Sequence, residues 1–154
     1  MKTPTLYLDS SVIGGYFDEE FEEATRTLWR QMETGQFRFV SSLLVDQEIS
    51  TAPERVQKLM TETFTQDDFL CITTEAQELA DAYLAQRIVP AKFADDALHV
   101  AIATTNGIYL IVSWNFKHLV NLQKEIGFNA VNLLHGYPSV RIISPLELIH
   151  EDEP

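Results

Sequence analysis

The stretch FADDALHVAIATTNGIYLIVSWN, residues 93–115, decides the fold that we predict for this chain. Two carboxylates, Asp95 and Asp96, open an apolar run with helical spacing, and an Asn-Gly pair ends that run with residues that tolerate a left-handed backbone. The apolar run 109–112 is then typical of a buried strand, and polar residues follow it directly. Because ligands bind at the carboxyl ends of the strands in open α/β sheets, this stretch predicts a helix, a strand and one edge of a site.

Strand and helix patterns alternate outward from this stretch in both directions. We expect strands at residues 5–8, 37–41, 69–73, 109–112 and 140–143. We expect helices at residues 18–34, 42–50, 53–64, 75–88, 95–105, 116–126 and 145–149, and a loop at 129–138. The alternation predicts a three-layer α/β/α fold, in which helices cover both faces of a central parallel β-sheet, and a single domain over residues 1–154.

The composition is that of a folded protein, since 45% of the 154 residues are hydrophobic. No apolar run approaches the ~20 residues of a membrane span, and the N-terminus enters a strand pattern without the apolar segment of a signal peptide. The single cysteine, Cys71, excludes an internal disulfide, and its apolar neighbours predict a buried thiol. These features favour a cytoplasmic protein with no membrane partner.

The net charge of −12 at first argues against a nucleic-acid ligand. Eight of the 23 acids, however, lie in two short segments, 18–23 and 151–153, and four more are candidate site residues. Removing these twelve leaves 11 acids against 11 Lys and Arg. The excess charge is therefore local, and it does not describe a uniformly acidic surface.

Several carboxylates stand at positions where chemistry and simple capping are both possible. Asp9 follows the first strand directly, where a metal or phosphoryl ligand is common, but it is also a good N-cap for a helical turn. Glu48 borders the apolar face of its helix, either as a site residue or as a solvated rim residue. Asp95 and Asp96 suit a helix N-terminus electrostatically, whether or not they bind a ligand.

The predicted topology brings these residues together. In a parallel sheet, the carboxyl ends of the strands share one edge with the N-termini of the following helices, so Asp9, Glu48, the Asp95–Asp96 pair and Asn115 converge. Clustered carboxylates repel one another unless cations lie among them. Hard oxygen ligands without a cysteine or a histidine pair fit Mg²⁺ or Mn²⁺ and not Zn²⁺. Such a site activates water and positions a phosphodiester for in-line displacement.

Four segments in this order resemble PIN-domain proteins: YLDSS (7–11), SSLLVDQEIS (41–50), DDALHVAIA (95–103) and VSWNFKHL (112–119). The resemblance implies a PIN-like fold and a Mg²⁺- or Mn²⁺-dependent endoribonuclease. It implies that Asp9, Glu48 and Asp96 are catalytic and bind the metal. Asn115 matches the fourth metal position, usually Asp, so an uncharged amide stands there and the number of metals, one or two, stays open.

The resemblance extends to supporting residues and partners. Ser10, Asp95 and Ser113 match or neighbour positions that support the metal site. Lys92 and Lys117 flank the site and are the candidates for contacts with the RNA phosphates. Many bacterial members are toxins of toxin–antitoxin pairs and form dimers, which implies a homodimer and a cognate antitoxin protein.

Three further side chains have simple structural explanations. We expect His99 to make structural hydrogen bonds and not to act in catalysis, and we expect His118 to lie on a helix surface. We expect Trp114 to pack beside its strand, although a tryptophan can also stack on a base.

Two other functions compete with the ribonuclease. A haloacid-dehalogenase-like phosphatase would use a strand-end aspartate as nucleophile with a second aspartate two residues later, where this chain has Ser11. A PIN-like module that binds RNA or protein with weak or no nuclease activity is the second alternative. Asn115 and the negative net charge motivate this second alternative.

Overall fold

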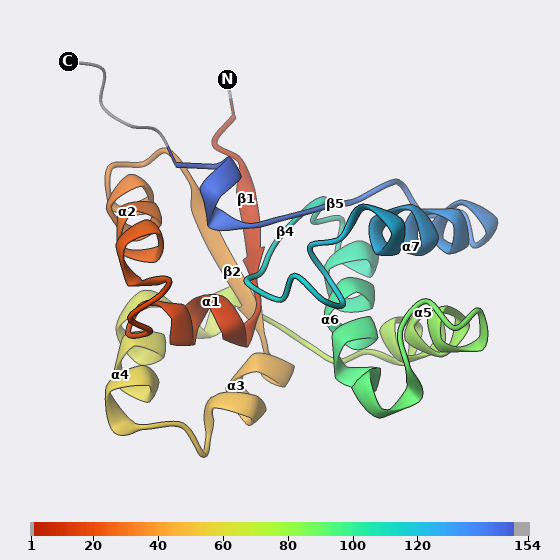
Figure 1. The fold of residues 1–154 in the computed structure, drawn as a ribbon, viewed down its shortest axis with the longest axis horizontal. Coiled ribbons are helices and arrows are strands. Elements are labelled where there is room, and N and C mark those ends of the chain that lie inside the picture. The colour runs from red at the N-terminus through yellow and green to blue at the C-terminus, as the bar shows by residue number, and fades with distance from the viewer. Residues whose placement is uncertain (1, 150–154) are drawn as a thin grey trace.

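Five parallel strands form the centre of the computed structural model, which describes residues 2–149 (Figure 1). The strands are β1 (Thr5–Leu8), β2 (Arg38–Ser42), β3 (Phe69–Leu70), β4 (Leu110–Val112) and β5 (Arg141–Ile143). Their order in the sheet is β3-β2-β1-β4-β5, and every neighbouring pair is parallel. The predicted parallel sheet is therefore confirmed, with β1 at its middle.

Seven α-helices and three short 3-10 turns, labelled η, connect the strands within residues 2–149. The helices are α1 (Ser10–Gly15), α2 (Glu22–Glu33), α3 (Leu43–Ile49), α4 (Glu54–Thr63), α5 (Thr74–Ala85), α6 (Ala94–Thr105) and α7 (Leu122–Leu134). The 3-10 turns are η1 (Gln66–Asp68), η2 (Ala91–Phe93) and η3 (Pro145–Glu147). Figure 1 shows α1, α2 and α4 on one side of the sheet and α5, α6 and α7 on the other, which confirms the α/β/α layers. No helix in this described part is long and apolar enough to cross a bilayer.

The helix of the deciding stretch, α6, lies deep in the structure. All eight residues from Ala97 to Thr104 are buried, so this helix is covered on every side in its middle. It ends as its sequence predicts, because Gly107 adopts a φ of +74° just after the last turn. Strand β4 follows and pairs with β1, with Val112 opposite Leu8.

The pairing register sets the position of the polar residues that follow the strands. Ser113 continues from β4 and Asp9 from β1, and the Asp9 N–H still donates to the Val112 carbonyl. On the other side of β1, β2 ends in Ser41 and Ser42. These residues therefore lie along one edge of the sheet, as the topology argument requires.

The largest departure from the sequence-based expectation concerns residues 116–138. The helix predicted at 116–126 is wrong before Leu122, and the loop predicted at 129–138 is wrong up to Leu134, because α7 begins only at Leu122 and continues to Leu134. Asn121 caps α7 through its side chain. Gly127 does not stop the helix, since it lies inside it where a Cβ would come within 2.8 Å of Ile88 Cδ1. The glycine thus serves close packing and not termination.

Smaller differences have similar local causes. The helix expected from residue 18 begins at Glu22, because Asp18 first accepts the Glu20 N–H in a turn. The strand expected at 69–73 is only two residues long, at the edge of the sheet. Cys71 follows this short edge strand and is exposed, so the predicted burial of its thiol is wrong. The acidic segment 151–153 lies outside the described residues.

Candidate functional site

Asp9 lies at the carboxyl end of β1 and is almost fully buried, at 4% exposure. Its Oδ1 accepts from Ser11 Oγ at 2.6 Å and from the Val12 N–H, and its Oδ2 accepts from Ser113 Oγ at 2.5 Å. Burial raises the pKa of Asp9, although His99 and the serine hydroxyls act to lower it. Asp9 does cap the short helix α1, and that cap leaves it at the sheet edge where we expected a site.

Glu48, on the last turn of α3, reaches inward from a partly exposed position, with 29% of its side chain exposed. Its Oε1 accepts from Ser10 Oγ at 2.9 Å and lies 2.7 Å from His99 Nε2. Burial acts to raise the pKa of Glu48, but the hydrogen bond and charge of His99 bring it below its usual value. Glu48 is thus a carboxylate held in place from inside, and not a freely solvated rim residue.

His99 links Glu48 to the core through a continuous chain of hydrogen bonds. Its Nδ1 lies 2.7 Å from Tyr7 Oη, and Tyr7 Oη lies 2.8 Å from Ser42 Oγ. Because a carboxylate only accepts, we assign the proton of the neutral ring to Nε2, so that Tyr7 donates to Nδ1 and Ser42 donates to Tyr7. Every polar group of this network has a partner, and His99 makes the structural hydrogen bonds that we expected.

Asp96 approaches the same edge from the first turn of α6. The N-cap of α6 is Phe93 without a side-chain hydrogen bond, so neither Asp95 nor Asp96 caps the helix. Burial raises the pKa of Asp96, and the charges of Asp9 and Glu48 raise it further, against the opposite effect of two histidines. Three carboxylates from distant parts of the sequence therefore act on one another, while Asp95 is exposed beside them.

Asn115 presents its amide nitrogen to this cluster. Its Oδ1 accepts from the backbone N–H groups of Lys117 and His118, at 3.2 and 3.0 Å. Because these groups only donate, the amide orientation is fixed, and Nδ2 faces Asp96 Oδ2 at 3.4 Å. A metal-ligand role for Asn115 through Oδ1 stays a prediction, and this orientation argues against it.

The turn that Asn115 caps buries the next histidine. His118 is only 5% exposed, so its predicted position on a helix surface is wrong. The N–H groups of Leu119 and Val120 donate to the Asn115 carbonyl, and this tight turn replaces the expected helix. The His118 ring packs on Phe93 with centroids 4.2 Å apart, and neither ring nitrogen has a hydrogen-bonding partner among residues 2–149.

Trp114, between Ser113 and Asn115, is a packing residue. Its ring stacks on Phe21 with centroids 4.3 Å apart, and its Nε1 donates to Thr25 Oγ1 at 3.0 Å. The side chain is buried, which leaves no free face for a base. The expectation of packing is therefore confirmed.

Positive charge near the cluster comes partly from a residue that the sequence did not single out. Arg55 lines a groove of about 400 Å³ together with Ser10 and Glu48. Its guanidinium lies 5.2 Å from the centre of the Phe17 ring. Lys92 and Lys117 are both exposed, as a contact with phosphate requires. Arg55 follows Pro53 at a helix start, and no pattern in that stretch separates it from other surface arginines.

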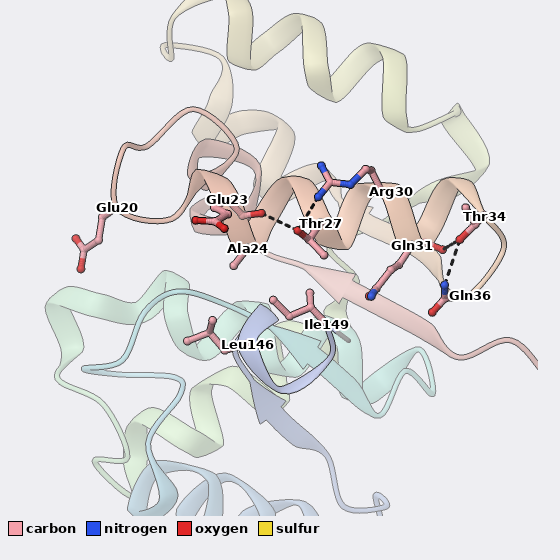
Figure 2. Close-up of a pocket in the computed structure, with 10 residues that line it drawn as sticks. All are labelled: Glu20, Glu23, Ala24, Thr27, Arg30, Gln31, Thr34, Gln36, Leu146 and Ile149. Carbon is pink, nitrogen blue, oxygen red and sulfur yellow. Dashed lines mark hydrogen bonds between the residues drawn. The ribbon is translucent and has the colours of Figure 1, made fainter. Parts of the chain in front are cut away.

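A groove of about 930 Å³ lies elsewhere, between α2 and η3 (Figure 2). Leu146 and Ile149 face α2 across it. Several of its polar side chains bind one another or the helix backbone, for example Arg30 with Thr27. None of the predicted site residues lines this groove, so we place the candidate chemistry at the sheet edge.

The side-chain oxygens at the sheet edge are of the chemical type that binds a hard cation. Asp9, Glu48 and Asp96 offer carboxylate oxygens alone, which suit Mg²⁺ and Mn²⁺. Within residues 2–149, however, no three His, Cys, Asp or Glu side chains lie close enough together to form a ready coordination site. Hydroxyl and imidazole donors occupy Asp9 and Glu48 instead.

Comparisons with known proteins add no assignment. No family model matches the sequence, and no curated protein matches it. The PIN-like family therefore stays a prediction from the four sequence segments, and the function has to be argued from the residues at the sheet edge.

Proposed function

We propose that this chain is a Mg²⁺- or Mn²⁺-dependent endoribonuclease whose active site lies at the carboxyl edge of the sheet. One observation carries the proposal: Ser113 binds Asp9, Asn115 faces Asp96 and Ser10 binds Glu48 at this one edge, where burial raises the pKa of Asp96. Three carboxylates that repel one another destabilise the folded chain unless a cation binds among them. Perturbed carboxylates of this kind are typical of functional sites.

In this proposal, Asp9, Glu48 and Asp96 hold the cation, and Ser10 and Ser113 hold the carboxylates. When bound, the ion lowers the pKa of a water molecule and stabilises negative charge on the phosphate. The chain itself orients the attacking water through Glu48, which His99 keeps ionised and fixed in direction. Asp95 lies outside this set as an exposed neighbour.

The substrate is RNA, and exposed cations guide its backbone. Arg55 borders the groove at Glu48. Lys92 lies four residues before Asp96 in the chain, Lys117 lies two residues after Asn115, and both lysines are exposed. These three charges counter the negative field of a chain whose formal charge is −12. Their contribution is sensitive to salt, since contacts with phosphate release counterions.

The proposed protein partners are a second copy of the chain and a cognate antitoxin, in the cytoplasm. Helix α7 exposes four large apolar side chains with exposures from 60% to 81%: Leu122, Ile126, Leu133 and Leu134. Exposed apolar side chains of this size are common at protein interfaces. The proposed homodimer rests on these side chains and on the resemblance to dimeric toxins, whereas the antitoxin rests on the resemblance alone.

Cleavage of RNA by matched aspartate variants tests the proposed function. Wild type is incubated with a single-stranded RNA and Mn²⁺ or EDTA, beside Asp96→Asn and the control Asp95→Asn. We expect Mn²⁺-dependent cleavage by wild type, at least a 100-fold loss in Asp96→Asn, and near-normal activity in Asp95→Asn, because only Asp96 belongs to the carboxylate cluster. Without metal, Asp96→Asn melts at the same temperature as wild type or higher, since it removes a repelled charge.

The alternative, a module that binds RNA or protein without cleaving it, is favoured by one observation. The described residues contain no ready coordination site, and Asn115 turns a donor toward Asp96. If wild type binds RNA in Mn²⁺ and leaves it uncut, this result supports the alternative and contradicts the proposed nuclease activity. Equal activity in Asp96→Asn and Asp95→Asn also contradicts the nuclease site as drawn.

A further inference from the structure

The turn after β4 contains a buried histidine ring without a hydrogen-bonding partner. His118 is 5% exposed, and neither its Nδ1 nor its Nε2 meets a partner within residues 2–149. An imidazole carries at least one N–H donor, and a buried donor without an acceptor destabilises the folded state. Since buried polar groups are nearly always paired, an unpaired one points to a ligand or a water molecule that completes it.

Packing explains why the His118 ring is buried but not why the residue is a histidine. The ring lies against Phe93, with centroids 4.2 Å apart and planes tilted by 35°. A phenylalanine would fill this place without introducing unpaired polar atoms. The ring nitrogens are therefore the feature that needs a function.

The neighbours of His118 place it next to Asp96. Phe93, on which the ring packs, is the N-cap residue of the helix that carries Asp96. The backbone N–H of His118 donates to Asn115 Oδ1, and the side-chain nitrogen of Asn115 faces Asp96. Burial raises the pKa of Asp96, and His99 and His118 act in the opposite direction, as expected for nearby groups.

We propose that Asn115 Nδ2 and the His118 imidazole form a subsite for one phosphate group of the RNA backbone, beside Asp96. Both groups are N–H donors, and the non-bridging oxygens of a phosphodiester are strong acceptors. Donors thus stand where the resemblance places a fourth carboxylate. The inference rests on the proposed function, because RNA supplies the phosphate.

The weak contact between Asn115 and Asp96 suits this role. At 3.4 Å, the Nδ2···Oδ2 distance is long for a hydrogen bond, so a phosphate oxygen can replace the carboxylate at small cost. The Asn115 Oδ1 stays bound to two backbone N–H groups, and this keeps the donor side turned toward the ligand. The Asn115 donor of the subsite is therefore oriented before RNA binds.

Binding of intact RNA by histidine variants tests the subsite. A fluorescein-labelled RNA decamer is titrated with wild type, His118→Phe and the control His135→Phe, with Ca²⁺ in place of Mn²⁺ and a gel to show that the RNA stays intact. His135 is exposed at the end of α7, so its variant controls for a change of histidine to phenylalanine away from the cluster. We expect the affinity for RNA to fall by about tenfold or more in His118→Phe and to stay unchanged in His135→Phe. A loss of this size corresponds to one hydrogen bond to a charged acceptor.

Two further measurements separate the subsite from other roles of His118. The affinity for Mn²⁺, measured by calorimetry, stays unchanged in His118→Phe, and the melting temperature stays equal or rises. His118→Gln, which keeps an N–H donor, binds RNA more tightly than His118→Phe does. A large loss of Mn²⁺ affinity in His118→Phe would make His118 a metal ligand and overturn the subsite.

Failure of the subsite is distinguishable from failure of the proposed function. Equal RNA affinities of wild type, His118→Phe and His118→Gln, with wild type still cleaving RNA in Mn²⁺, overturn the subsite alone. The absence of both RNA binding and cleavage in wild type overturns the proposed function, and the subsite with it.

Discussion

Two buried histidines belong to the same candidate site, but they differ in how their rings are bonded. His99 has a partner on each nitrogen, Glu48 on one side and Tyr7 on the other. His118 has none within the described chain, and its neighbour Asn115 reaches Asp96 only at 3.4 Å. The difference separates one half of the site, which the fold itself completes, from the other half, to which we assign a ligand.

The two halves follow from how each carboxylate is held. Glu48 comes from α3 and is fixed through α6 and β1, so its direction is set before any ligand arrives. Asp96 is half-buried, its pKa is changed in opposite directions by two histidines and two carboxylates, and one long contact holds it. Preorganisation on one side and unsatisfied groups on the other are what a site that binds a cation and an anion together requires.

The same substitution at the two histidines gives the largest contrast in stability. We expect His99→Phe to lower the free energy of unfolding by about 2 kcal/mol or more, because it removes one of the two hydrogen bonds of Glu48 Oε1 and one of the two of the buried Tyr7 hydroxyl. We expect His118→Phe to leave it unchanged or to raise it, because it removes two unpaired polar atoms. Denaturant unfolding without metal measures both, and equal losses in the two variants would erase the distinction between the halves.

We expect a bound cation to stabilise the folded chain through Asp96 and the carboxylates near it. We expect Mn²⁺ in large excess over its dissociation constant to raise the melting temperature of wild type by several degrees, since it binds the folded chain alone. The double variant Asp9→Asn/Asp96→Asn serves as control and shows a much smaller rise. Equal shifts in both proteins would mean that the ion binds elsewhere, for example at the acidic residues 18–23.

The Glu48 half should show its own dependence on pH. Against the effect of burial, the Glu48 hydrogen bond and charge raise the pKa of His99, and His99 in turn lowers the pKa of Glu48. His99 therefore stabilises the fold fully below its usual pKa of 6.5, and this stabilisation is lost as the pH rises through the raised pKa of the folded chain. The stabilisation from Glu48 is lost as the pH falls below the usual pKa of 4.5 and through the lowered pKa of the folded chain. We expect the difference in melting temperature between wild type and His99→Phe to be largest near pH 5.5 and smaller at pH 9. A difference that grows toward pH 9 would contradict the pairing.

The smallest effect comes from restoring a carboxylate at the fourth position. In Asn115→Asp, one oxygen keeps the two backbone N–H groups and the other replaces the donor that faces Asp96. We expect a several-fold gain in Mn²⁺ affinity at low salt and a slightly lower stability without metal, because a further like charge joins the cluster. Calorimetry with Mn²⁺ measures the gain. An unchanged affinity would place this side chain away from the ion.

Sequence patterns predict the fold where a local signal agrees with the tertiary one. The apolar run and the Asn-Gly stop of residues 93–107 specify α6, and the alternation of elements specifies the parallel sheet. The pattern fails at 116–138, because one side chain, Asn115, closes a turn that helical spacing does not reveal. Gly127 fails as a stop because its role is contact with Ile88, which lies far away in the sequence.

The candidate site shows the same division. Its carboxylates follow from topology, since strand ends and helix N-termini share one edge. The contact of Tyr7 with His99 joins residues 92 positions apart, and no spacing rule contains it. The place of Ser42 at the sheet edge is predictable, because this polar residue directly follows the strand expected at 37–41. The burial of His118 is not predictable in this way, since it depends on the turn that replaces the expected helix.

Anomalous diffraction from crystals grown with Mn²⁺ tests the central claim most directly. The account predicts a strong peak at the carboxyl edge of the sheet, in contact with oxygens of Asp9, Glu48 and Asp96. It also predicts no contact between this ion and the ring of His118. A chain that cleaves RNA in Mn²⁺ but places the ion away from these three carboxylates, or binds none there at saturating Mn²⁺, would contradict the account.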